Sequence, residues 1–310
     1  MTSAHDHRHH HTDGHADANF NHAFAIGIAL NTAFVAIEAF YGWRINSLAL
    51  LADALHNLSD VAGLVLAWGA ALAGKLRPDA RHTYGFKRAS ILAAFCNAAL
   101  LLLAMGSLGW EALGRLQAPE PTQGWTIIAV AGVGIVINAA TALLFMRGAH
   151  GDLNIRGAFL HMVGDALVSL AVVVGGALYL WQGWSWIDPL LSLAIAVMIV
   201  LGTWGLFRQS LHLLFDGVPA HIDLAAVRHL LLTLPGTADV HDLHVWAMGT
   251  SDVALTAHLV LAEAVTDSSA VLHQAEHELH EHFEIRHVTL QLESTEHARH
   301  CALGSAAGCH

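Results

Sequence analysis

Charged side chains are scarce in this sequence. Asp, Glu, Lys and Arg make up 13% of its 310 residues, about half the share found in ordinary soluble domains. Hydrophobic residues make up 55%, and the mean hydropathy is +0.50. These values exclude an ordinary soluble domain, and we expect a polytopic protein of the lipid bilayer.

Positive charge is the scarcest kind. The chain has 14 Lys and Arg against 25 Asp and Glu, and its formal net charge is −11. Because phosphate binding needs clustered Lys and Arg, we expect no nucleic-acid partner. The three cysteines, Cys96, Cys301 and Cys309, offer neither a disulfide framework nor a CxxC pair. The first nineteen residues are polar, so no secretory signal peptide is expected there.

Six apolar runs are each long enough to cross a bilayer as a helix. They cover residues 20–42, 47–73, 89–115, 124–146, 156–182 and 186–209. The sequence therefore predicts an α-helical membrane protein with a domain of six transmembrane helices over residues 20–210.

Lys and Arg are unevenly distributed over the connecting loops. The loop after the second run carries Lys75, Arg77, Arg81, Lys87 and Arg88. Arg147 and Arg156 flank the short loop after the fourth run, and Arg208 lies at the end of the sixth. The alternate loops carry only Arg44 and Arg115. By the positive-inside rule, we expect both termini in the cytoplasm and the protein in the inner (plasma) membrane.

The composition becomes that of a soluble domain over residues 216–295. A helix at 221–234, strands around 240–245 and 253–262, a helix at 268–282 and a strand at 288–292 are predicted. This order, α-β-β-α-β, predicts a cytoplasmic α+β domain with helices on one sheet face. Residues 1–19 and 296–310 lack apolar periodicity, and we expect them to be disordered tails.

Histidine is abundant and concentrated in the polar ends. Of the 25 histidines, seven lie before residue 23 and fourteen after residue 205. The N-terminal group fits an affinity tag or a natural metal-collecting tail, and the Asp and Arg residues among the histidines favour the second interpretation.

Two copies of one motif lie within the apolar runs. His56 is followed four residues later by Asp60 in the second run, and the fifth run repeats the spacing with His161 and Asp165. On a helix this spacing places both side chains on one face. Two such helices offer two imidazoles and two carboxylates, a set that zinc accepts tetrahedrally. Hydrogen-bonded core residues are the alternative, but a central Asp costs about 2.5–3.5 kcal/mol or more in a membrane.

Two further carboxyl groups lie in the predicted spans. Asp53, three residues before His56, is either an accessory to the metal site or a structural residue. Glu38 is a functional candidate by its position in the membrane, without an assigned role.

The polar parts contain weaker metal-site candidates. Asp79 and His82 on the loop after the second run indicate half of a surface metal site or simple solvated polarity. In the C-terminal domain, four residues lie on or beside the strands and could bind metal: His241, His244, His258 and Glu293.

The sequence resembles the cation diffusion facilitator family, in its zinc-transporting branch, over about residues 20–295. The matching stretches are Ser47 to Asp60, Tyr84-Gly85, Arg156-Gly157-Ala158 leading to the second motif, Asp188-Pro189 and His241 to Trp246.

This resemblance implies a zinc/proton antiporter that exports zinc from the cytoplasm, not an enzyme. It implies a homodimer whose cytoplasmic domains pair and are metallochaperone-like, with His56, Asp60, His161 and Asp165 as the transport site. It further implies that Asp79 and His82 could form a loop site, where Phe86 replaces a His. In the cytoplasmic domain, Gln291 replaces a His and Glu293 an Asp, so zinc binding there would be weaker or differently arranged.

Two other interpretations are open from the residues. An intramembrane zinc hydrolase would need three protein ligands, an open metal position and a general base, and the sequence has no HExxH. A membrane-anchored metal sensor would place the function in the cytoplasmic domain, and the charge in the second and fifth runs argues against it.

Overall fold

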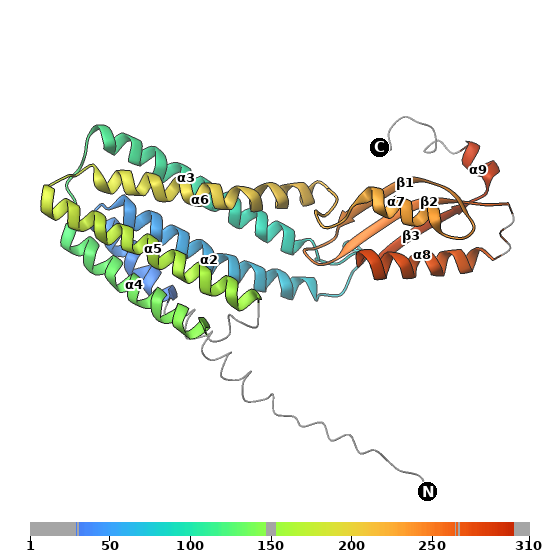
Figure 1. Cartoon of the computed structure of the whole chain (residues 1–310), viewed down its shortest axis with the longest axis horizontal. Helices are drawn as coiled ribbons and strands as arrows, with labels where there is room; N and C mark the ends of the chain where they lie inside the picture. Colours follow the sequence, from blue (N-terminus) through green and yellow to red (C-terminus); the bar gives the residue numbers. More distant parts are fainter. Residues whose placement is uncertain (1–28, 30, 147–152, 264, 266, 301–310) are drawn as a thin grey trace, which may run out of the picture. The chain divides into compact units, whose positions relative to one another are not determined.

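The computed structural model describes residues 29, 31–146, 153–263, 265 and 267–300 (Figure 1). The chain divides into two compact units. One comprises Met1–Ala62 and Leu100–Gly202, and the other Gly63–Ala99 and Thr203–His310.

Five of the six predicted spans are complete helices in the structure, and each is long and apolar enough to cross a membrane. They are α2 (Leu48–Gly74), α3 (Ala89–Gln117), α4 (Gly124–Met146), α5 (Leu153–Gln182) and α6 (Ile187–Leu214). The first predicted span is helical over its described residues 31–44. The structure thus confirms the helical fold class, with α6 ending four residues beyond the predicted domain boundary at 210.

Small residues allow the helices of the first unit to pack closely. Its core contains Ala49, Ala52 and Ala131, each buried. Gly176 of α5 meets α4, because a Cβ at this position would lie 3.2 Å from the Gly124 carbonyl oxygen. Close backbone approach at small residues is the usual way in which membrane helices associate.

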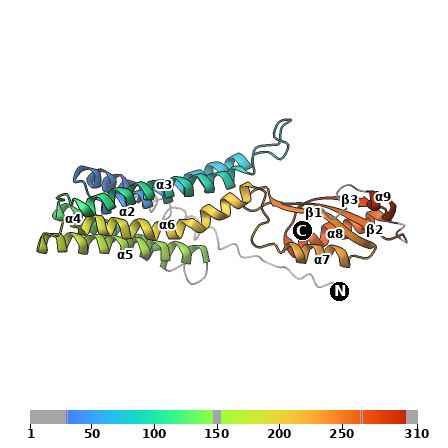
Figure 2. The same ribbon diagram turned by 90° about the horizontal axis from the view of Figure 1, so that it is seen from above.

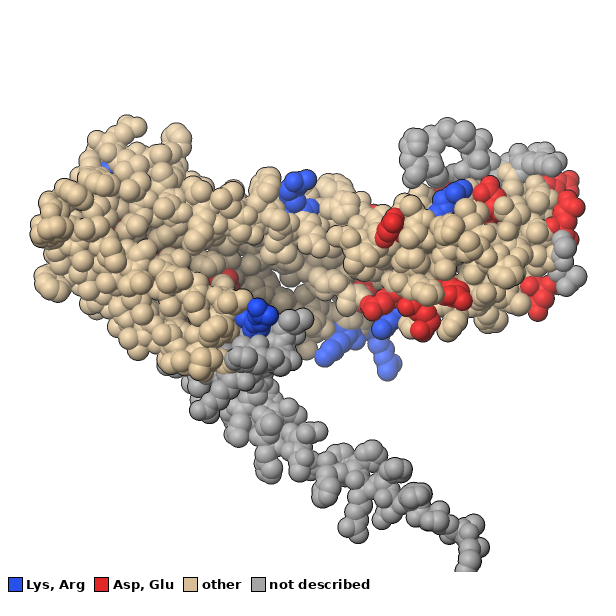
Figure 3. All heavy atoms as spheres, viewed as in Figure 1, with Lys and Arg blue, Asp and Glu red and all other residues tan. Residues whose placement is uncertain are grey.

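The outward faces of these helices are apolar. On the face drawn in Figure 3, few charged side chains lie on the helices, whereas Asp and Glu gather on the C-terminal α/β part. Trp43, Trp110, Trp125 and Trp181 lie at the end of the first unit where α2 and α4 begin and α3 and α5 end, and each is between 73% and 80% exposed. Exposed Trp at one level of a helix bundle is typical of a membrane–water interface.

The C-terminal part of the second unit is a three-stranded sheet with helices on one face (Figure 2). Its strands are β1 (Thr237–Ala247), β2 (Val253–Leu261) and β3 (His287–Glu293), in the order β1-β2-β3. β1 and β2 are antiparallel, and β2 and β3 are parallel. Helix α7 (Leu224–Thr233) precedes β1, and α8 (Ser268–Phe283) crosses from β2 to β3. This confirms the predicted α-β-β-α-β order.

Side chains along β2 alternate between the two faces of the sheet. Leu255, Ala257 and Leu259 are buried in one core with Leu231 of α7 and Leu279 of α8. Because side chains alternate along a strand, His258 points to the opposite face. The helices therefore cover one face, and the histidine lies on the other.

Each of the two helices begins at an aspartate that caps it. The Asp223 carboxylate accepts a hydrogen bond from the Ala225 amide at the start of α7. Asp267 accepts from the amides of Ser269 and Ala270 at the start of α8. These bonds satisfy amides that have no partner within the helix.

The structure differs from the expectation of a disordered tail at 296–310. A short helix, α9, spans Thr295–His300. The Ser294 hydroxyl accepts a hydrogen bond from the His297 amide at 3.2 Å and starts this helix. The remainder of that tail, 301–310, and the predicted N-terminal tail, 1–19, lie outside the described residues.

The buried position of Leu279 gives a test of this core. We expect Leu279→Ala to lower the unfolding free energy of the C-terminal domain by about 2–5 kcal/mol, because the substitution leaves a cavity. Amide hydrogen exchange of the full-length protein, read by mass spectrometry over α8 and β2, measures this change. Gln274→Ala, on the exposed face of α8, is the matched control and should change protection little.

Candidate metal sites

Helices α2 and α5 bring the two His–Asp motifs together. Nε2 of His161 lies 3.1 Å from Oδ2 of Asp60, and Nε2 of His56 lies 3.6 Å from Oδ1 of Asp165. The histidine of each helix thus faces the aspartate of the other. This reciprocal pairing requires antiparallel helices.

The donor atoms have separations that suit a tetrahedral ion. The contacts within each helix are 3.8 Å for His56–Asp60 and 3.6 Å for His161–Asp165. Zinc–nitrogen and zinc–oxygen bonds of about 2.0–2.1 Å in a tetrahedron place neighbouring donors about 3.3 Å apart. These four separations lie within about half an ångström of that value, although His56 and His161 contact different oxygens of Asp165. Donor atoms of His56, His161 and Asp165, one from each, lie close enough together to hold an ion, and Asp60 contacts both histidines beside them.

Burial of the four side chains is uneven. The side chain of Asp165 is 4% exposed and that of His56 20%, whereas Asp60 and His161 are 38% and 41% exposed. Oδ2 of Asp165 is buried without a hydrogen-bond partner among the described residues. A buried carboxylate oxygen without a donor is costly unless a cation satisfies it.

A further group of polar side chains lies next to the His56–Asp60 motif of α2. Oδ2 of Asp53 accepts a hydrogen bond from the Ser169 hydroxyl at 3.1 Å. The Asn57 amide donates to the Asp53 backbone carbonyl at 3.1 Å and to Oδ1 of the same residue at 3.4 Å. Asp53 therefore links α2 to α5 beside the motif. The sequence pointed to Asp53 but not to Asn57 or Ser169, because their role depends on which helix faces them.

The sheet of the C-terminal domain brings together His241, His258 and Glu293, three of the four predicted residues. The fourth, His244, is exposed and does not join this group. Nε2 of His241 lies 3.1 Å from Oε2 of Glu293, and Nδ1 of His258 lies 2.9 Å from Oε1 of the same carboxylate. His241 and His258 are register partners on β1 and β2. All three residues lie on the sheet face away from α7 and α8, and they could hold one metal ion.

Hydrogen bonding keeps Glu293 ionised. Burial alone raises the pKa of its carboxyl, but hydrogen bonds from His241 and Gln291 and the proximity of His258 outweigh burial and lower the pKa. Gln291, which occupies a ligand position of the family pattern, donates to Oε1 of Glu293 at 2.7 Å. The amide therefore orients the carboxylate.

Asp242 is a neighbour that sequence analysis missed. Its carboxylate lies 3.6 Å from Nε2 of His258 and 3.0 Å from Nε2 of His244. In a regular strand the residue after His241 would point to the opposite face. Here the register shifts between His241 and His244, and Asp242 has a positive φ of 49°. Such a bulge is not visible in the sequence.

Asp79 and His82 are held on their loop by hydrogen bonds to the backbone. Oδ1 of Asp79 accepts backbone hydrogen bonds from Arg81 at 2.7 Å and His82 at 2.6 Å. These bonds lower the pKa of the Asp79 carboxyl. No third potential ligand joins the pair in the described part of the chain. Metal binding by this loop stays a prediction.

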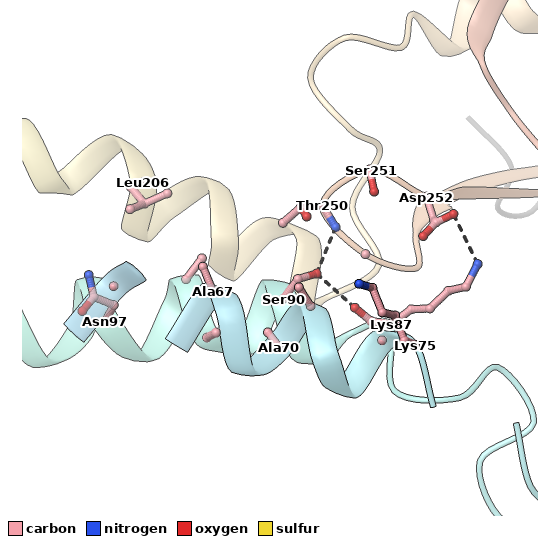
Figure 4. Close-up of a pocket in the computed structure, with 16 residues that line it drawn as sticks. Ala67, Ala70, Lys75, Lys87, Ser90, Asn97, Leu206, Thr250, Ser251 and Asp252 are labelled. Carbon is pink, nitrogen blue, oxygen red and sulfur yellow. Dashed lines mark hydrogen bonds and ion pairs between the residues drawn. The ribbon is translucent and has the colours of Figure 1, made fainter. Parts of the chain in front are cut away.

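A cavity of about 520 Å³ lies within the second unit (Figure 4). Small residues of α2 and α3 and the β1–β2 turn line it. At its rim, Nζ of Lys87 pairs with Asp252 at 3.2 Å, and the Ser90 hydroxyl accepts a hydrogen bond from the Thr250 amide at 3.1 Å. Asp252 is the single carboxylate among the lining residues, and no histidine or cysteine accompanies it. This cavity is therefore not a metal site of the kind formed by the two clusters above.

Comparison with known proteins gives matches over almost the whole chain. Residues 24–215 match the family described as the cation efflux transmembrane domain, and residues 219–295 match the cation efflux protein, cytoplasmic domain. The zinc transporter ZitB of Escherichia coli is 34% identical over 310 residues, covering 98% of each chain.

Two further relatives are of similar identity. The metal cation efflux system protein CzcD of Cupriavidus metallidurans is 35% identical, covering 91% of this chain and 89% of the relative. A cadmium, cobalt and zinc/H(+)-K(+) antiporter of Bacillus subtilis is also 35% identical, covering 88% of each.

The geometry of the intramembrane cluster predicts the effect of removing one donor. We expect four single variants to weaken zinc binding by more than about 100-fold each: His56→Ala, Asp60→Ala, His161→Ala and Asp165→Ala. Residues that only hydrogen-bond a metal ligand already contribute about 10–100-fold to metal affinity, so the loss of a ligand itself should cost more. Equilibrium binding of radioactive zinc to purified protein that also carries His241→Ala and His258→Ala measures this without a contribution from the cytoplasmic cluster. The control is His244→Ala, an exposed histidine outside both clusters, and near-normal binding by any of the four variants would contradict the assignment.

Proposed function

This chain belongs to the cation diffusion facilitator family of cation efflux proteins, and on that premise we propose that it exports zinc from the cytoplasm in exchange for protons through His56, Asp60, His161 and Asp165. The observation that carries the proposal is the convergence of these four side chains from two antiparallel helices. The relatives support the cargo and the exchange, since one is a zinc transporter and another an antiporter for cadmium, cobalt and zinc.

Exchange follows from the chemistry of the ligands. Imidazole binds metal when neutral and carboxylate when ionised, so zinc and protons compete for the same groups. Zinc arriving from the cytoplasm displaces protons, and protons from the opposite side displace zinc. A small change in the tilt of α2 against α5 would open the site alternately to each side. The exposure of Asp60 and His161 fits an open state of this cycle.

The chain is a transporter and not an enzyme. A zinc hydrolase needs a position on the metal for water and a general base. In the arrangement proposed here, four protein donors fill the tetrahedron, and no position is left for a nucleophilic water. A sensor would not need charged ligands within the membrane helices, where they are costly.

The C-terminal domain lies in the cytoplasm, and we place the N-terminus on the same side, in the inner (plasma) membrane. The excess of Lys and Arg on alternate loops supports this orientation. Within the domain, His241, His258 and Glu293 would bind zinc as a second, non-transport site. Their ionised carboxylate and paired imidazoles suit the metal.

Zinc uptake by inside-out membrane vesicles tests both exchange and orientation. We expect uptake when the lumen is acidic, because luminal protons must replace zinc at the site. Ammonium chloride, which removes the pH gradient, should stop concentrative uptake. All media should contain choline in place of potassium, so that potassium cannot serve as the counter-ion. Uptake that persists without the pH gradient would contradict proton exchange.

Two controls separate orientation from activity. Right-side-out vesicles should release preloaded zinc rather than accumulate it, and equal uptake by both preparations would contradict the proposed topology. If zinc uptake required potassium and not an acidic lumen, potassium and not the proton would be the counter-ion.

We further propose that the protein is a homodimer paired through its cytoplasmic domains. The match of residues 219–295 to the cytoplasmic domain of this family supports the pairing. Light scattering of the purified full-length protein, corrected for detergent, should give twice the 33.1 kDa mass of the chain. The mass of one chain would contradict the proposal.

A further inference from the structure

Two carboxyl groups in the first unit are buried without a positive partner. Glu38, on the helix of residues 31–44, and Asp53, on α2, are both 0% exposed. Among the described residues, neither forms an ion pair with Lys or Arg. Neither belongs to the four proposed ligands. The transport mechanism above does not use them.

The surroundings of the pair are polar but contain no fixed cation. The Glu38 carboxyl faces that of Asp53 and the Asn57 amide, and neither of its oxygens has a hydrogen-bond partner of normal geometry among the described residues. Asp53 is held by the Ser169 hydroxyl and by Asn57. Two hydrogen bonds reach the four carboxyl oxygens, both at Asp53, and the Glu38 oxygens have no donor among the described residues.

Two ionised carboxylates cannot share such a site at low cost. Like charges in contact repel, and burial away from water disfavours both charged forms. A proton placed between them removes one charge and supplies the missing hydrogen bond, as in other carboxyl pairs that share a site.

We propose that Glu38 and Asp53 together form a proton-binding site, separate from the metal ligands, that holds one proton when the transport site is free of zinc and releases it when zinc binds. This inference rests on the proposed exchange of zinc for protons. It adds a carrier for a proton that the four ligands do not account for.

Asp165 provides the link between the pair and the metal. Asp165 lies one helical turn before Ser169 on α5, and the Ser169 hydroxyl donates a hydrogen bond to Asp53. An ionised Asp165 at this position repels a further negative charge on the pair. A zinc ion bound to Asp165 neutralises this charge, so the pair holds its proton less strongly. His56 lies three residues after Asp53 on α2, and its positive charge when protonated opposes the negative charge of Asp165. The groups that face the pair are therefore Asp165 and His56, together with the neutral Asn57 and Ser169.

Proton release on zinc binding is the direct test. Purified protein in weak buffer at pH 7 receives one zinc per transport site, and a pH dye reports the protons released. We expect Glu38→Gln to bind zinc but release about one proton fewer than the unaltered protein. Asp53→Asn should lose the same proton, and the double variant should lose about one, not two, because the proton is shared. Glu111→Gln, an exposed carboxyl on α3, is the matched control and should release the full number.

A transport readout separates coupling from general damage. In reconstituted vesicles, exchange of radioactive zinc for unlabelled zinc needs no net proton movement, whereas net uptake does. We expect Glu38→Gln to keep zinc–zinc exchange and to lose most net uptake driven by an acidic lumen. Loss of both, with zinc binding intact, would overturn the proposal by indicating a structural role.

The two proposals fail in different ways. If the unaltered protein neither binds zinc nor exchanges it for protons, the proposed function is wrong. If it does both, and Glu38→Gln and Asp53→Asn release the same number of protons as the unaltered protein, only the proton site is wrong. If either variant does not fold, the other decides the outcome by the same proton count.

Discussion

The cost of charge in a low-dielectric span is the constraint on which this structure depends. The described spans contain carboxyl groups at Glu38, Asp53, Asp60 and Asp165 with no Lys or Arg paired to them. Ionised and alone, each would be destabilising. A divalent cation or protons must therefore neutralise these groups in turn. This alternation is the physical basis of an exchanger. The protein cannot switch the side to which its pocket opens while the pocket holds no cation and its carboxylates are ionised.

The same constraint explains how α2 is anchored. Asp188, at the start of α6, accepts hydrogen bonds from the Ser47 hydroxyl and from the Leu48 amide, the latter at 2.8 Å. A carboxylate at a helix N-terminus is stabilised by the unpaired amides and by the helix dipole. The oxygens of the Asp188 carboxylate thus have hydrogen-bond donors, whereas those of Glu38 have none among the described residues. The comparison separates Asp188, which has a structural role, from Glu38, for which we propose the binding of a proton.

The C-terminal domain brings its histidine and carboxylate side chains together in a different way. In the spans, helical spacing places His and Asp together. In the sheet, strand register does so, since His241 is opposite His258, and Glu293 lies on the adjacent strand. The bulge at Asp242 adds another carboxylate that regular alternation would have directed away. Gln291 shows that a position that lacks a metal-binding side chain can still contribute by orienting Glu293.

The sequence by itself determined the membrane class, the helix spans, the α-β-β-α-β order and the His–Asp motifs, because each depends on local composition or on short spacing along one element. It could not determine which faces meet. Only the tertiary structure decided that Ser169 bonds Asp53, that Glu38 faces Asp53, and that Asp242 turns toward His258. These relations depend on helix rotation and on a strand bulge. Many helix rotations bury apolar faces equally well in a uniformly apolar span, so the sequence pattern does not select one of them.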